Sequence, residues 1–193
     1  MSNAHLNAEE RLLLLRIARE AIECSLNKKE LHKLELSVMP QRLQEQGASF
    51  VTLTMDGNLR GCIGALQASQ PLALDVQEHA VAAATEDYRF RPVSSQELSA
   101  LVIEISCLSP SRELDYASSS DLLAKLRPGV DGVVLRRGFQ RATFLPQVWE
   151  KISDPADFLT QLCFKMGVNG DLWKKEHLQV QVYQVEEFHE GVG

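Results

Sequence analysis

The chain has 193 residues, of which 45% are hydrophobic and 24% are charged, and its formal net charge is −6 at pH 7. These proportions are typical of a globular protein with a buried core, and the acidic balance argues against a nucleic-acid-binding surface, which is normally basic. No apolar run approaches the roughly 20 residues that span a bilayer and no signal peptide is visible, so we expect a cytoplasmic protein outside the membrane.

The first predicted element is an amphipathic helix that begins after Asn7. Glu10 follows three residues into the helix, which gives the spacing of a capping box. Apolar residues then recur at helical spacing as far as Cys24, which places this cysteine in the core. Residues 1–4 precede the helix and are expected to be a disordered end or a cloning remnant, while a single domain, divisible into a larger and a smaller lobe, covers residues 5–190.

A β-hairpin and a second helix are predicted next. Residues 50–55 and 59–66 are rich in strand-forming side chains, and Asp56-Gly57 between them is a strong turn signal. The helix opens at Pro71, a residue favoured in the first turn. It continues through an alanine-rich stretch at 80–84, whose small side chains allow close packing against a sheet.

The second half of the chain predicts strands in hairpins with helices between them. The expected elements are a strand at 101–108, a short helix at 121–126, a hairpin of 133–137 with 141–145, a helix that starts at Pro155 and ends before Gly167, and a last strand at 179–185. Residues 109–120 are the most linker-like. Because the pattern is not a strict βαβ alternation, the predicted class is α+β, with an antiparallel or mixed sheet flanked by helices.

The four cysteines lie about 40 residues apart or more, with no Cys-x-x-Cys pair: Cys24, Cys62, Cys107 and Cys163. This spacing favours free thiols over a disulfide framework or a zinc site. We expect no metal site and no cofactor, and we expect Cys107 and Cys163 to pack in the core as Cys24 does.

The segment Leu-Arg-Gly-Cys-Ile-Gly at residues 59–64 is the most unusual in the chain. In a strand, Arg60 and Cys62 would share one face roughly 7 Å apart, and a guanidinium close to a thiol favours the thiolate nucleophile. Gly61 and Gly64 would let a ligand approach the backbone. The alternative is that Cys62 is a small packing residue and the glycines permit tight helix packing, and the residues alone favour this alternative.

A second group of charged residues follows the alanine-rich helix at 86–93. Glu86 and Asp87 are general-base candidates, and Arg89 is a candidate anion-binding group. A salt-bridged turn explains the same residues equally well. A third group, Arg136, Arg137 and Arg141, has the weaker interpretation of a solvated hairpin face.

The segment at 57–64 resembles the signature of the AMMECR domain family, and further stretches match that family in the expected order. These stretches are residues 86–90, 103–110, 131–135, 142–148 and 158–173. The resemblance implies a two-lobed α+β fold in which the signature faces a groove between the lobes. It also suggests protein A of the AmmeMemoRadiSam system, whose partners are a Memo-like protein and a radical S-adenosylmethionine protein.

Three functions are open from the sequence, of which a nucleic-acid or translation-linked regulatory role would require a contiguous basic face that the acidic composition does not favour. The other two fit the site residues. In the first, the protein binds a small molecule or peptide in the inter-lobe groove through Arg60, Gly61, Gly64 and Arg89, and acts with the Memo-like and radical S-adenosylmethionine partners. In the second, it is an enzyme that uses Cys62 as a nucleophile or redox thiol on a small anionic substrate, assisted by Arg60, Glu86 and Asp87. Binding or regulation is placed first because no base partner of Cys62 can be read from the sequence.

Overall fold

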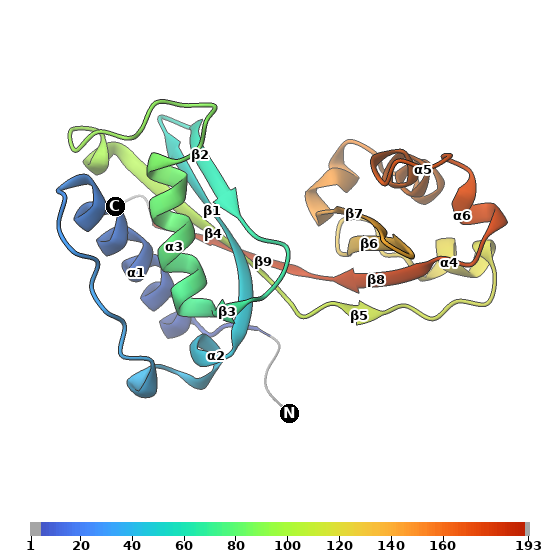
Figure 1. Cartoon of the computed structure of the whole chain (residues 1–193), viewed down its shortest axis with the longest axis horizontal. Coiled ribbons are helices and arrows are strands. Elements are labelled where there is room, and N and C mark those ends of the chain that lie inside the picture. Colours follow the sequence, from blue (N-terminus) through green and yellow to red (C-terminus); the bar gives the residue numbers. More distant parts are fainter. Residues whose placement is uncertain (1–4, 192–193) are drawn as a thin grey trace. The chain divides into compact units, whose positions relative to one another are not determined.

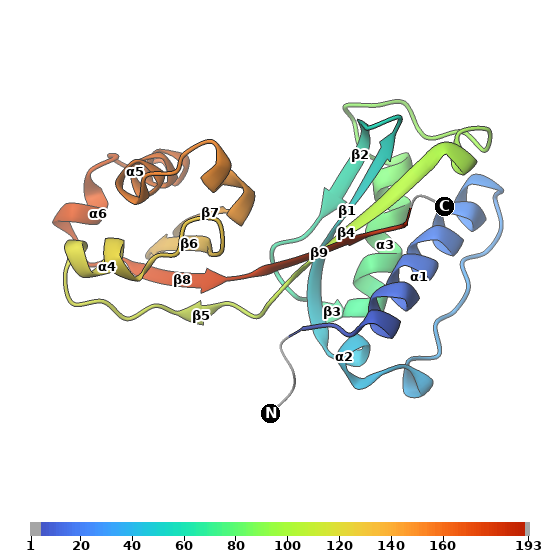
Figure 2. The ribbon, with the colours of Figure 1, turned by 180° about the vertical axis from the view of Figure 1, so that it is seen from behind.

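The computed structural model describes residues 5–191, and the chain forms two compact units (Figures 1 and 2). Unit 1 contains the chain up to Ser109 and again from Glu186, whereas unit 2 comprises Pro110–Val185. The chain therefore leaves unit 1 at the start of the linker-like segment 109–120 and returns to it near the C-terminus. The four-residue start at 1–4 lies outside the described residues.

Unit 1 is a helix-backed antiparallel sheet. Its strands lie in the order β2-β1-β4-β9, with the short β3 paired to the start of β1. The elements are α1 (Ala8–Leu26), η1 (Leu36–Val38), α2 (Gln41–Gln44), β1 (Gln46–Met55), β2 (Asn58–Gly64), β3 (Gln70–Pro71), α3 (Leu72–Thr85), η2 (Leu98–Ala100), β4 (Leu101–Leu108) and β9 (Val185–His189).

Unit 2 has its own four-stranded sheet, in the order β5-β8-β6-β7. The elements are β5 (Arg112–Glu113), α4 (Ser119–Lys125), β6 (Gly132–Arg137), β7 (Gln140–Phe144), η3 (Pro146–Glu150), α5 (Pro155–Lys165), α6 (Leu172–Lys175) and β8 (Gln179–Tyr183). Its core includes the stacked rings of Trp149 and Phe158, whose centroids lie 3.7 Å apart. Each unit therefore has a separate hydrophobic core.

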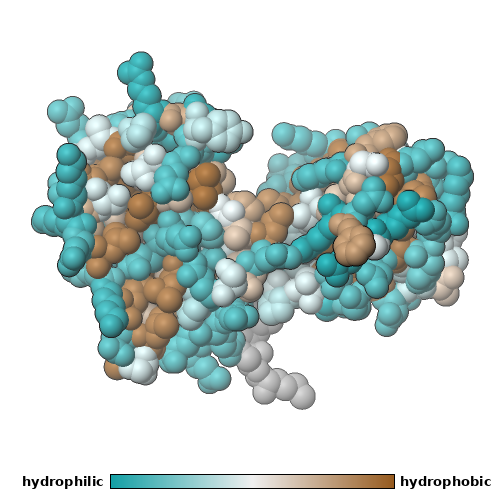
Figure 3. Space-filling model, in the orientation of Figure 1, coloured by the Kyte–Doolittle hydropathy of each residue, from teal (hydrophilic) through white to brown (hydrophobic). Residues whose placement is uncertain are grey.

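None of the helices within residues 5–191 is long and apolar enough to cross a membrane. On the visible face of each unit, apolar residues form separate groups divided by hydrophilic side chains (Figure 3).

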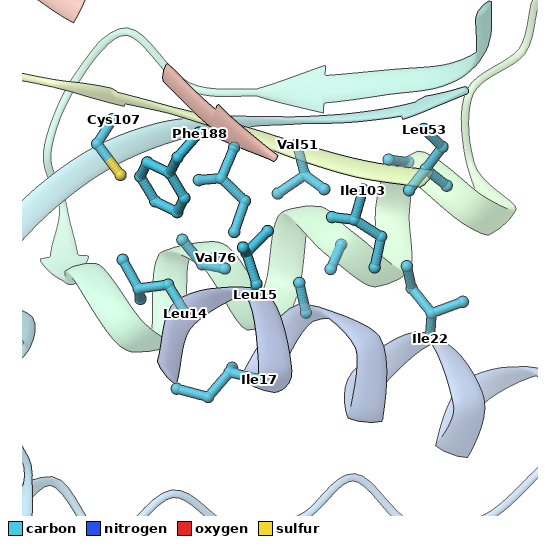
Figure 4. Close-up of a cluster of buried hydrophobic side chains, with 14 of the residues drawn as sticks. Leu14, Leu15, Ile17, Ile22, Val51, Leu53, Val76, Ile103, Cys107 and Phe188 are labelled. Carbon is cyan, nitrogen blue, oxygen red and sulfur yellow. The ribbon is translucent and has the colours of Figure 1, made fainter. Parts of the chain in front are cut away.

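Helices α1 and α3 cover one face of the unit 1 sheet. The alternating residues Val51, Leu53, Ile103 and Ile105 are fully buried in the core of this unit. Figure 4 shows Val51, Leu53 and Ile103 between the strands and the helices. Seen from behind, β1, β4 and β9 lie in front of α3, with no helix of the unit over them (Figure 2). Because side chains alternate along a strand, the residues between the buried ones point to this uncovered face.

Local sequence signals produce several of these elements as expected. The capping box of α1 is confirmed, since Asn7 and Glu10 each accept a hydrogen bond from the other's backbone N–H. The β1–β2 turn places both Asp56 (φ 51°) and Gly57 (φ 75°) in the left-handed region, which suits the right-handed twist of a hairpin. The α+β class with antiparallel sheets and flanking helices is also confirmed.

One strand prediction was wrong at its C-terminal end. The sequence favoured one last strand at 179–185, but β8 ends at Tyr183 and β9 begins at Val185 in the other unit's sheet. No glycine or proline separates the two strands, so their apolar residues read as one run.

The packing role predicted for three cysteines is confirmed. Cys24, Cys107 and Cys163 are buried free thiols, whereas Cys62 is partly exposed. Burial raises the pKa of Cys107 to about 12, so this thiol stays protonated at physiological pH.

A buried polar cluster ties α3 to β1. The Asp75 carboxylate accepts a hydrogen bond from Ser49 Oγ at 2.6 Å, and its Oδ2 lies 3.1 Å from His79 Nδ1. The hydrogen bond to Asp75 raises the pKa of His79, with burial acting in the opposite direction. The charged imidazolium is therefore favoured in the folded protein.

We predict that His79→Gln destabilises the protein more at pH 5.5 than at pH 8. Because the pKa of His79 is higher in the folded protein, protonation of this side chain stabilises the fold. The stabilisation is fully present below the ordinary histidine pKa of about 6.5, and it is lost as the pH rises through the raised pKa of the folded protein. Urea unfolding should show a loss of about 1–3 kcal/mol at pH 5.5. The exposed His32→Gln is the matched control, and an equal loss at both pH values would contradict the assignment.

Candidate functional site

Three polar side chains form a row across the uncovered face of the unit 1 sheet. Thr52 on β1 lies opposite Cys62 on β2 and, on its other side, opposite Glu104 on β4. Neighbouring strands are about 5 Å apart, so a thiol, a hydroxyl and a carboxyl follow one another at that spacing. We call Cys62, Thr52 and Glu104 the polar row.

Cys62 is held in this row by its side chain and by its backbone. The Thr52 hydroxyl donates a hydrogen bond to Cys62 Sγ, with an O···S distance of 3.3 Å. Among residues 5–191 this is the only side-chain hydrogen bond that the thiol makes. Unlike the other three cysteines, Cys62 is partly exposed.

The backbone of Cys62 lies at the free edge of the sheet, where strand N–H and C=O groups lack a neighbouring strand. The Asp87 carboxylate accepts the Cys62 N–H at 2.8 Å, and the Arg89 guanidinium donates to the Cys62 carbonyl at 3.3 Å. The Arg89 guanidinium also donates twice to Asp87, at 2.9 and 2.6 Å. We call this pair of side chains the edge clamp.

Charge pairing keeps the edge clamp ionised. Hydrogen bonds from Arg89, together with the Cys62 N–H, hold the pKa of the buried Asp87 well below its usual range, although burial opposes the shift. The same pair raises the pKa of Arg89. A carboxylate so strongly stabilised is a poor general base near neutral pH.

Arg60 points into a different set of contacts. Its guanidinium forms two hydrogen bonds with the Glu97 carboxylate, at 2.8 and 3.2 Å, and donates to the carbonyls of Arg91 and Pro92. The bond from Arg60 and further bonds from Ser94 lower the pKa of Glu97 to about 2. Arg60 therefore fixes the loop that follows α3.

The β-bulge in β2 explains why Arg60 lies away from Cys62. Thr54 pairs with Leu59 and Leu53 with Gly61, so Arg60 is the extra residue in the ladder. An extra residue interrupts the alternation of side chains along the strand. Arg89, rather than Arg60, is thus the guanidinium that contacts Cys62 among the described residues.

The two glycines beside Cys62 are in close contact with the protein itself. A Cβ at Gly61 would lie 2.1 Å from the carbonyl oxygen of Ala83 on α3. A Cβ at Gly64 would lie 2.4 Å from the Ser49 carbonyl oxygen. Close packing of β2 on α3 and β1 therefore accounts for both positions without a ligand.

Glu86 is not brought into this cluster. Its side chain is exposed at the C-cap of α3, and within the described chain its carboxylate makes no hydrogen bond or ion pair. The structure thus joins Asp87 and Arg89 to Cys62, links Arg60 to Glu97, and leaves Glu86 outside both groups.

Glu104 is the site residue that the sequence reasoning missed. Burial is the main cause that raises the pKa of Glu104, and the negative charge of the nearby Glu187 raises it further. His189 lowers the pKa and so opposes both effects. A raised pKa brings a carboxyl closer to the range useful for acid–base chemistry. The signal was the only charged residue of a mostly apolar strand. It alternates with the buried Ile103 and Ile105, so its side chain points to the uncovered face.

Residues 5–191 contain no group of three or more His, Cys, Asp or Glu side chains that could hold a metal ion.

The helix-backed sheet and its polar row define an α+β protein with a candidate site on a sheet face. Comparison with known proteins assigns the family: the AMMECR1 family model matches residues 15–188, and the chain belongs to the AMMECR1 family.

Relatives and a solved structure extend over almost the whole chain. A protein of Methanothermobacter thermautotrophicus is 37% identical, covering 98% of this chain and 99% of the relative. Protein MJ0810 of Methanocaldococcus jannaschii is 34% identical, covering 96% and 92%. The crystal structure of the uncharacterized protein PH0010 from Pyrococcus horikoshii is similar with a TM-score of 0.74 and 33% identity, covering 92% of this chain and 89% of that one.

We predict that Glu104→Gln stabilises the protein at pH 8 and that the gain disappears below about pH 4. A raised folded-state pKa means that the ionised carboxylate is disfavoured in the folded state, so a neutral amide relieves this cost only where Glu104 would be charged. Chemical unfolding should show a gain on the order of 0.5 kcal/mol at pH 8. Glu20→Gln on the exposed side of α1 is the control, and a loss of stability at pH 8 would argue against a strained carboxylate in the row.

Proposed function

We propose that the protein is a binding or regulatory protein whose contact surface is the polar row. In this proposal it acts with the Memo-like and radical S-adenosylmethionine proteins that the family resemblance implies, as protein A of an AmmeMemoRadiSam system. The observation that carries the proposal is the placement of the Cys62 thiol, the Thr52 hydroxyl and the Glu104 carboxyl side by side on an uncovered sheet face.

The edge clamp supports a binding role because it fixes the backbone under the row. Asp87 and Arg89 satisfy the N–H and the C=O of Cys62, so the strand edge is closed to another strand. A partner or ligand must then bind the side chains on the sheet face. Preorganised side chains lose little conformational entropy when they bind, which favours affinity.

The contacts of the charged groups argue against a catalytic role for most of them. Asp87 is paired with Arg89, and Arg60 is paired with Glu97, so neither is free to accept a proton or to orient an anionic substrate. Glu86 does not reach the thiol. Among residues 5–191, Cys62 thus has a hydroxyl neighbour but no adjacent general base.

The alternative function is an enzyme that uses Cys62 as nucleophile or redox thiol. The specific observation in its favour is Glu104, a carboxyl with a raised pKa on the far side of Thr52. In this alternative the Thr52 hydroxyl would turn, accept the thiol proton and pass its own proton to the Glu104 carboxylate, which would release a thiolate toward an anionic substrate.

Alkylation of Cys62 by iodoacetamide tests the proposal, with mass spectrometry to follow each cysteine. Binding predicts that Cys62 reacts in the folded protein and that purified Memo-like or radical S-adenosylmethionine partner protein slows its reaction at least about fivefold, the lower end of typical coupling and shielding effects. The buried Cys24, Cys107 and Cys163 should remain unlabelled and act as internal controls.

Two outcomes would change the assignment. A reaction at pH 6.5 that is faster than that of free cysteine, and that slows in Glu104→Gln, would favour the enzyme. Absence of labelling until the protein unfolds would make Cys62 a packing residue and exclude both functions for the thiol.

A further inference from the structure

The hairpin between β6 and β7 in unit 2 presents a phenylalanine at its tip. Gly138 and Phe139 form a two-residue turn, and Gly138 has φ +58°, as the first position of a tight hairpin turn with glycine requires. The Phe139 side chain is fully exposed, with a relative accessibility of 109%. A large aromatic ring in water gains nothing from the fold.

Arginines surround this tip on both faces of the hairpin. Arg136 and Arg141 lie directly opposite each other in the ladder and share one face. Within the described chain neither of these two guanidinium groups forms a hydrogen bond or an ion pair. Arg137 lies on the other face, where it pairs with the half-exposed Glu176. Like charges directly opposite each other in a sheet are destabilising.

The residues at the tip lie outside the hydrophobic core of unit 2. The hairpin contributes Val133, Leu135 and Ala142 to the core, and the exposed residues begin with Arg136 and Arg141. Exposed aromatic and unpaired arginine side chains are the types that dominate protein interfaces when they become buried. The tip therefore has the composition of a contact site rather than of a structural element.

We propose that the β6–β7 tip inserts into an apolar socket with a carboxylate rim on a partner protein. Phe139 fills the socket, and Arg136 and Arg141 pair with the rim carboxylates. Arginine suits this role because its planar guanidinium binds a carboxylate through two parallel hydrogen bonds. This proposal concerns unit 2 and is independent of the function proposed for the polar row.

The arrangement favours a protein socket over a nucleic acid or an anionic bilayer. Arg137 is already paired with Glu176, so the groups left for an occupant are Arg136 and Arg141 on one face and the Phe139 ring at the tip. Carboxylates beside an apolar site match this combination, and a protein surface supplies both. Unit 2 has ten Lys and Arg against nine Asp and Glu, so the excess negative charge of the chain resides in unit 1. The negative charge of the chain repels an extended polyanion, which carries many charges. A few carboxylates on a socket rim are repelled much less and can pair locally with the arginines.

Selection from a phage library of random linear peptides tests this proposal, with the whole chain as target and the Arg136→Glu/Arg141→Glu variant for counter-selection. The expected peptides combine Asp or Glu with a cluster of apolar residues. Synthetic copies of the selected peptides should bind Phe139→Ser and the double arginine variant at least about tenfold more weakly. Arg112→Glu, on the exposed β5 strand, is the control and should change binding by less than about twofold.

Several outcomes would overturn the proposal. One is selection of neutral or basic peptides, or of peptides that bind the double variant equally well. Another is binding to single-stranded oligouridine or to phosphatidylserine-containing vesicles that is stronger than binding to the peptides. If the double variant loses this binding, the tip is assigned to that polyanion. Arg136→Glu should leave the melting temperature unchanged or raise it, because it replaces a like-charge pair, and a fall of several degrees would show that the arginines serve the fold.

Discussion

The free edge of β2 at Cys62 is the constraint on which the rest of the site depends. An edge strand leaves backbone N–H and C=O groups without a neighbouring strand, and in this chain one carboxylate and one guanidinium take that place. Asp87 and Arg89 also pair with each other, so the clamp is a closed charge-assisted unit. The clamp closes the edge to strand addition and fixes the plane of the peptide groups that carry the thiol.

This constraint separates the residues of the signature into two roles. The glycines and Arg60 serve the fold: Gly61 and Gly64 bring β2 against neighbouring backbone, and Arg60 anchors the 91–97 loop through Glu97. The Cys62 side chain, by contrast, projects to the sheet face that α1 and α3 leave uncovered. The unusual composition of the segment thus reflects the packing of an edge strand, and its functional content lies in the side chains that face away from the core.

Local signals explain how much of this could be predicted from the sequence. The capping box at Asn7 and the Asp56-Gly57 turn depend on residues a few positions apart, and both formed as expected. The edge clamp joins residues that are 25 and 27 positions apart in the chain. The sequence shows that the 86–91 loop is charged, but it does not show that Asp87 and Arg89 bind the backbone of Cys62. The position of Arg60 was not predictable, because a bulge shifts the alternation that a regular strand would follow.

The register of the strands explains why the rest of the site could not be predicted from the sequence. Glu104 was recognisable as a polar residue on an exposed strand face, but its alignment with Thr52 and Cys62 requires the strand order β2-β1-β4. That order depends on contacts between distant parts of the chain, which hydrophobic periodicity does not encode. In unit 2, similarly, the composition of the 136–141 hairpin was visible, whereas the complete exposure of Phe139 was not.

Hydrogen exchange at the Cys62 amide, followed by NMR, tests the central claim most directly. The account predicts that this edge-strand amide is protected in the native protein and that Asp87→Ala accelerates its exchange at least about tenfold, the equivalent of one net hydrogen bond. The amide of Val51, in the middle of the sheet, should retain its protection in the variant. An unprotected Cys62 amide in the native protein, or protection that survives Asp87→Ala, would contradict the clamp.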